Sequence, residues 1–134
     1  MSRSESRIWV LALAGLFWTS SLFAQTVGPK AEDLAKSRQK GVNFLKSSQG
    51  EGGHWTSPDA PGISGLVTYS LLLSGVPASD PTVEKALKHL ASFTQPDGGI
   101  YSPKGRHGNY ETAICLLAFH EANKDGKYTE AIAK

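Results

Sequence analysis

The chain has 134 residues, one cysteine and a formal net charge of +2, with 19% charged residues in which lysines and acidic residues are interspersed. This length allows one small domain. The mixed charge argues against nucleic acid or anionic lipid as a partner. A single cysteine excludes an internal disulfide, so stability must come from packing.

The first 24 residues have the three-part layout of a secretory signal. Two arginines precede an apolar stretch from Ile8 to Phe17, and small and polar residues then lead to Ala24. A membrane anchor is the alternative, but this stretch of about ten residues is short of the roughly 20 that a membrane-spanning helix needs. We therefore predict a cleaved signal over residues 1–24, a mature domain over residues 25–134, a secreted or periplasmic location, and no membrane span after cleavage.

Amphipathic helices are expected at three places in the mature domain. Apolar side chains recur at helical spacing between charged ones over residues 30–48, 81–93 and 128–134. The second of these helices has a clear start, because Asp80 supplies a side-chain acceptor and Pro81 presets the first φ angle. Such helices expose one face to water, so we place them on the outside.

Two other segments are apolar on nearly every side, residues 63–73 and 113–119. Helices of this kind are enclosed. A buried strand is the alternative for runs this short, although β-branched residues are few in the first of them. The connecting residues 49–62 and 95–109 are rich in Gly, Ser and Pro and are predicted to be loops.

The alternation of amphipathic and apolar helices is itself a repeat. Gln49 and Gln95 mark its phase and lie 46 residues apart, a period typical of two-helix units. We assign the first repeat to about residues 30–75, the second to about 80–124, and the start of a third to about 128–134. The outer, amphipathic helices and the inner, apolar helices would form two layers.

The stretch from Lys40 to Trp55 resembles the QW motif of squalene-hopene cyclases and related prenyltransferases, the terpenoid cyclase superfamily. In that motif a basic and a small residue precede an aromatic and an aliphatic one, followed by Gln and by Gly-x-Trp. The matching residues here are Lys40, Gly41, Phe44, Leu45, Gln49, Gly53 and Trp55. A weaker second copy keeps Gln95 and Gly99 and has Tyr101 in place of Trp.

This resemblance implies an all-α fold, an α/α toroid (α-α barrel) in which inner and outer helices alternate. Two hairpin repeats and the start of a third would form a fragment of such a ring. The motif residues also have a structural role on physical grounds. The amides of Gln49 and Gln95 can satisfy backbone groups at helix ends, and Trp55 and Tyr101 offer flat faces against which those amides can lie. We predict that they brace the fold and do not catalyse.

Catalytic groups are harder to find. The resemblance would imply either an Asp-x-Asp-Asp acid motif, which is absent, or zinc ligands, for which His107, Glu111 and Cys115 are weak candidates at a spacing of four residues. The simpler interpretation places His107 before the helix and makes Cys115 a small core residue. Leu116 follows the cysteine, which excludes a Cys-Gly-Glu-Gln thioester signature. We predict no metal and no cofactor, and the catalytic residues stay unknown.

Two functions remain open from the sequence. The first is an exported toroid repeat protein with a structural role, or one that binds an isoprenoid, another hydrophobic ligand or a partner. The second is the N-terminal part of a terpenoid-cyclase-like or prenyltransferase-like enzyme, acting on isoprenoid substrates, whose catalytic residues lie beyond Lys134. Whether the protein is an enzyme is therefore undecided at this point.

Overall fold

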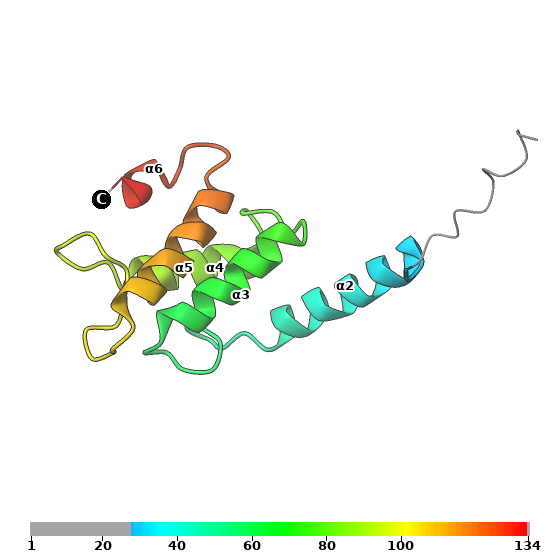
Figure 1. The fold of residues 1–134 in the computed structure, drawn as a ribbon, viewed down its shortest axis with the longest axis horizontal. Coiled ribbons are helices and arrows are strands. Elements are labelled where there is room, and N and C mark those ends of the chain that lie inside the picture. Colours follow the sequence, from blue (N-terminus) through cyan, green and yellow to red (C-terminus); the bar gives the residue numbers. More distant parts are fainter. Residues whose placement is uncertain (1–27, 134) are drawn as a thin grey trace, which may run out of the picture. The chain divides into compact units, whose positions relative to one another are not determined.

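Helices make up the regular structure of residues 28–133, the part of the chain that this computed structural model describes. In chain order they are α2 (Ala31–Ser47), α3 (Pro61–Leu73), α4 (Pro81–Ala91), α5 (Gly108–Ala122) and α6 (Thr129–Ile132) (Figure 1). Within this range there is no strand, and Thr94 and Ile100 form an isolated bridge. The all-α prediction is confirmed. The predicted signal over residues 1–24 lies outside the described residues.

The helices α3 and α5 lie side by side and run parallel at the centre of the domain (Figure 1). Two glycines of α3 allow the close approach. A Cβ atom on Gly62 would stand 3.2 Å from the Glu111 side chain, and one on Gly65 would stand 3.2 Å from the Cys115 sulfur. From Gly62 to Gly65 on α3, the neighbour on α5 moves from Glu111 to Cys115, in the same chain direction. The two helices therefore run parallel.

The helix α4 covers this pair with one apolar stripe. Its four buried residues are at most 1% exposed and pack into the core with Leu71 and Phe119: Val83, Ala86, Leu87 and Leu90. The predicted start of α4 is also present, since the Asp80 side chain accepts a hydrogen bond from the Thr82 backbone N–H at 3.0 Å. Burial of this stripe contributes apolar stabilisation to the shared core.

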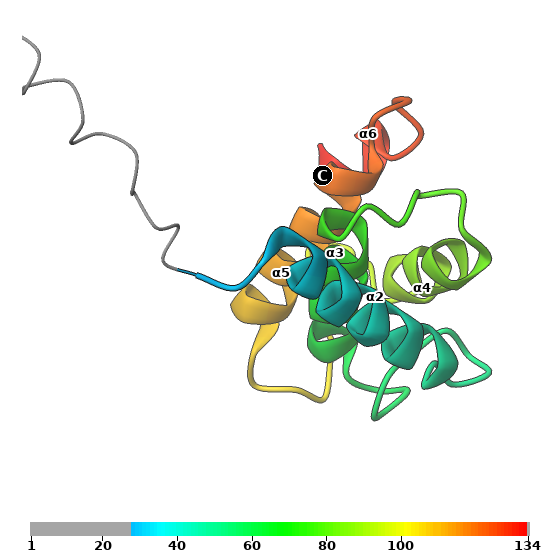
Figure 2. The same cartoon turned by 90° about the vertical axis from the view of Figure 1, so that its right-hand side faces the viewer.

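The helix α2 is held differently, mainly at its C-terminal end. Val42 is its one buried residue, and Figure 1 shows the helix leading away from the other helices. In Figure 2 it runs obliquely in front of α3. The Lys46 ammonium lies 2.6 Å from an Asp80 carboxylate oxygen. This hydrogen bond from Lys46 keeps the pKa of Asp80 below its ordinary value. The end of α2 is thereby tied to the start of α4.

The predicted enclosure of the two apolar helices is only half realised. The helical assignment is correct, but each helix has one exposed stripe. On α3 the stripe consists of Ile63, Leu66 and Leu73, which are 45%, 44% and 59% exposed. On α5 it includes Tyr110 and Leu117. The packing explains the difference, because α4 lies on one side of the pair and, among the described residues, nothing buries the other side.

Candidate functional site

The two exposed stripes belong to one surface. They flank the α3–α5 contact on the same side of the two parallel helices, and the Tyr110 ring would come within 3.3 Å of a Cβ atom at Gly62 on α3. We call this surface the α3–α5 apolar face, defined by Ile63, Leu66, Leu73, Tyr110 and Leu117. Contiguous apolar surface of this kind marks a place where a ligand or partner binds more often than isolated exposed residues do.

The loop between α2 and α3 contains the strongest part of the predicted motif. Trp55 is 5% exposed, and its indole N–H donates at 2.8 Å to the Leu45 carbonyl in the last turn of α2, which also accepts the Ser48 hydroxyl at 3.2 Å. The Gln49 amide donates to the Thr82 carbonyl at 2.9 Å and to the Gly53 carbonyl at 3.3 Å. These hydrogen bonds connect α2, the loop and α4, an arrangement suited to bracing.

The front part of the motif makes few contacts. Lys40 and Gly41 are exposed, and no atom lies within 4 Å of a Cβ built on Gly41. Phe44 is 68% exposed. Leu45 is half-buried and packs against the core. The motif residues of α2 therefore divide into two sets, one that holds the domain together and one that faces outward.

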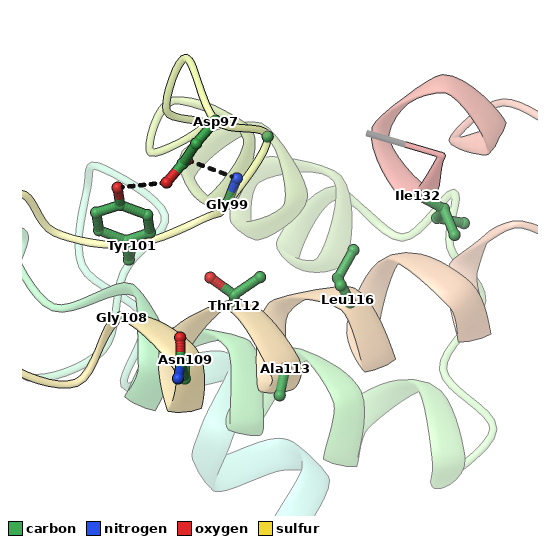
Figure 3. Close-up of a pocket in the computed structure, with 10 residues that line it drawn as sticks. Asp97, Gly99, Tyr101, Gly108, Asn109, Thr112, Ala113, Leu116 and Ile132 are labelled. Carbon is green, nitrogen blue, oxygen red and sulfur yellow. Dashed lines mark hydrogen bonds between the residues drawn. The ribbon is translucent and has the colours of Figure 1, made fainter.

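The second motif copy differs from the first in register. The Gln95 amide donates to the Phe93 and Tyr101 carbonyls, at 2.9 and 3.0 Å. The Tyr101 hydroxyl reaches outward and donates to Asp97 at 2.9 Å, so Tyr101 does not occupy a buried site like that of Trp55 (Figure 3). Ile100, one residue earlier, is 1% exposed and fills that place.

Backbone hydrogen bonds give the true alignment of the two loops. The first loop has bonds from the Gly50 N–H to the His54 carbonyl and from the Gly53 N–H to the Gly50 carbonyl. The second has the same pair, from the Gln95 N–H to the Gly99 carbonyl and from the Gly98 N–H to the Gln95 carbonyl. Gly53 and Gly98 also share a left-handed backbone, with φ of 88° and 85°. The loops match at a spacing of 45 residues.

The weak metal candidates are not brought together as a ligand set. His107 lies exposed just before α5, whereas the Glu111 carboxylate is buried and accepts the Ser102 backbone N–H at 2.8 Å. Cys115 is fully buried, and this burial, reinforced by the nearby Glu111, raises the pKa of its thiol to about 12. Such a thiol stays protonated at neutral pH and is a poor nucleophile. Among residues 28–133, no group of three or more His, Cys, Asp or Glu could hold a metal ion.

A pair of histidines was not anticipated as a unit. The ring centroids of His54 and His89 lie 5.6 Å apart, and each ring has one buried nitrogen without a hydrogen-bond partner. His89 also packs edge-on against Phe93 at 5.2 Å. Burial, and secondarily the proximity of His54, lowers the pKa of His89 below its ordinary 6.5. The sequence suggests only a loop residue and a surface residue, because the contact between them is tertiary.

This lowered pKa predicts a pH dependence of stability. The unfolded chain binds a proton at His89 near pH 6.5 and the folded chain only at a lower pH, so the free energy of unfolding should fall as the pH drops below that value. Urea midpoints measured between about pH 5.5 and 7.5 should show the decline. His89→Gln should flatten it, and the matched change His120→Gln, at an exposed site, should not. An equal decline in both variants would contradict the assignment.

A hollow in the described surface lies beside the second loop. It has a volume of about 610 Å³ and is bordered by Gly98, Gly99, Tyr101, the α5 residues Thr112, Ala113 and Leu116, and Ile132 of α6 (Figure 3). The ionisable groups in its walls are Asp97 and Tyr101. They bond to each other, because the Asp97 carboxylate accepts hydrogen bonds from the Tyr101 hydroxyl and the Gly99 N–H. These hydrogen bonds hold the Asp97 and Tyr101 side chains to the second loop.

The fold and the site together define a small all-α domain with an open apolar face and no assembled catalytic group among its described residues. Comparison with family models, curated proteins and solved structures finds no match to this chain. Within residues 28–133, no helix is both long and apolar enough to cross a membrane. The function must therefore be argued from the geometry alone.

Proposed function

We propose that this chain is part of an exported α/α-toroid repeat protein that binds a hydrophobic ligand or partner through the α3–α5 apolar face. The repeat arrangement is supported by the matching loops and by the alternation of amphipathic α2 and α4 with apolar α3 and α5. In such a ring the parallel inner helices line a central cavity. The export rests on the sequence of residues 1–24 alone.

One observation carries the binding role. The α3–α5 apolar face has five large apolar side chains whose exposed fractions run from 43% at Leu117 to 59% at Leu73. Such exposure would be a costly arrangement without an occupant. No charged residue interrupts the α3 stripe, because Pro61–Leu73 contains none. An isoprenoid or another elongated apolar ligand fits this chemistry, since it needs contact area and few polar partners.

Binding to the α3–α5 apolar face can be tested with a fluorescent farnesyl analogue as the probe. The full chain should bind it with a saturable rise in emission, and Leu66→Glu combined with Leu117→Glu should weaken binding by at least about tenfold. Leu34→Glu is the matched control, since Leu34 is 51% exposed on α2, outside this face. The helical content of all variants is compared by circular dichroism. Equal binding by the double variant and the control would refute the proposed face.

A further inference from the structure

His54 of the first loop and His89 of α4 have no histidine counterparts at the spacing of 45 residues that aligns the two loops. The corresponding positions are Gly99 in the second loop and Phe44 on α2. The second loop forms the same backbone hydrogen bond with glycine at this position, from the Gln95 N–H to the Gly99 carbonyl. A histidine is therefore not needed to build such a loop, and the contact between two histidines needs another explanation.

Each of the two rings has one buried nitrogen without a hydrogen-bond partner in the described part of the chain. These atoms are Nδ1 of His54 and Nε2 of His89. A buried polar atom that stays unpaired costs free energy, and a bound ion or water is a common reason for finding one. The two atoms belong to rings whose centroids lie 5.6 Å apart. One occupant could therefore bond to both.

The separation of the two rings suits a metal ion. Zn²⁺ binds a histidine nitrogen at about 2.0–2.1 Å, so two imidazoles on one ion have ring centroids about 5–6 Å apart. The observed 5.6 Å lies in this range. Imidazole suits Zn²⁺, Cu²⁺ and Ni²⁺, whereas Ca²⁺ and Mg²⁺ take oxygen ligands. The lowered pKa of His89 also keeps its ring neutral near pH 7, which is the form that binds a metal.

The first loop and α4 hold the two rings in place. The His54 ring lies over Gly50, where a Cβ atom would stand 2.8 Å from the ring carbon Cε1. The Gly50 N–H donates to the His54 carbonyl at 2.9 Å, which closes the turn that carries this ring. Gln49 fastens the loop to α4, the helix of His89, by its hydrogen bond to the Thr82 carbonyl. An ion could therefore bind with little rearrangement of the backbone.

We propose that Nδ1 of His54 and Nε2 of His89 bind one Zn²⁺ or a chemically similar divalent ion, between the first loop and α4. The described residues include no group of three or more His, Cys, Asp or Glu that could hold a metal. Water would therefore fill the other coordination positions, unlike a closed structural zinc site with four protein ligands. The ion would join the loop to α4 and stabilise the folded chain. This inference does not depend on the ligand proposed for the α3–α5 apolar face.

Zinc titration of the full chain, followed by calorimetry, tests this inference. The chain carries no histidine tag and is first freed of metal with EDTA, which is then removed. We expect one ion per chain at neutral pH, and His54→Gln or His89→Gln should each weaken binding at least about tenfold. The control is the double variant His107→Gln and His120→Gln, which removes the two other histidines, both exposed. It should bind zinc like the unchanged chain, and circular dichroism should show all variants folded.

Nitrogen NMR of the histidine rings gives a second measurement, which needs no substitution. Zinc should shift Nδ1 of His54 and Nε2 of His89 and leave the rings of His107 and His120 unchanged. Absence of zinc binding would overturn the inference and assign the two nitrogens to water. Equal binding by His54→Gln or His89→Gln, or loss of binding in the control, would also overturn it. Farnesyl-probe binding is measured with EDTA present, so the failure of one proposal is distinguishable from the failure of the other.

Discussion

Replacing Trp55 by alanine should lower the free energy of unfolding by about 3 kcal/mol. The indole is 5% exposed and packs in the core with Val42 and Leu71. Truncation would leave a cavity between the first loop and the end of α2. It would also leave the Leu45 carbonyl without the indole N–H that bonds it at 2.8 Å. Both losses act at the joint where α2 is attached, so the α2 end should loosen first.

Urea unfolding followed by circular dichroism measures this effect. Tyr101→Ala is the matched control, because the sequence places Tyr101 in the same role whereas its hydroxyl bonds the exposed Asp97. Its cost should stay below about 1 kcal/mol. Comparable losses in the two variants would mean that the second motif aromatic braces the fold as the first does, contrary to the structure.

The positions of the amphipathic and the apolar helices could be predicted from the sequence, because the spacing of apolar residues along a helix indicates which of its sides can be buried. The boundaries of α2 and α3 agree within two residues with the predicted ones. The start of α5 was placed too late: the helix begins at Gly108 instead of residue 113. Gly108 and Asn109 are weak helix formers. Tertiary contacts override this preference, because the Glu111 carboxylate is held by the Ser102 N–H at 2.8 Å.

The alignment of the two loops and the α3–α5 apolar face were harder to predict from the sequence than the helices. Adjacent Gly98 and Gly99 allow two alignments with the first loop, and only the hydrogen bonds show that Gly98 corresponds to Gly53. The exposed stripes on α3 and α5 were also missed. A segment that is apolar all round indicates that every side can be buried, but it does not indicate which side this chain covers.

The joint between α2, the first loop and α4 concentrates the specific interactions of the domain. Lys46 and Asp80 form an ion pair at 2.6 Å, with Asp80 also capping α4. The ion pair is partly exposed and contributes little by itself. Gln49 adds a hydrogen bond to the first turn of α4. Since α2 buries so little apolar surface, its placement depends on these contacts and on Trp55.

Gly53 is the position in this joint where an added atom should be least tolerated. Its φ of 88° is left-handed, which costs other residues about 1–2 kcal/mol. An added Cβ would also stand 2.5 Å from the Lys85 carbonyl oxygen, a backbone atom of α4 that cannot rotate away. Moving α4 to relieve the clash would disturb the stripe that covers α3 and α5, at about 1–3 kcal/mol. Gly53→Ala should therefore destabilise by about 3 kcal/mol in total.

Gly75→Ala separates the cost of backbone strain from the cost of the clash with α4. Gly75 has a similar φ of 91°, but no atom lies within 4 Å of a Cβ built there. Its substitution should show the backbone strain alone, about 1–2 kcal/mol. The excess loss in Gly53→Ala, measured by urea unfolding, then reports the contact between the first loop and α4. Equal losses at the two glycines would mean that α4 does not press on the first loop.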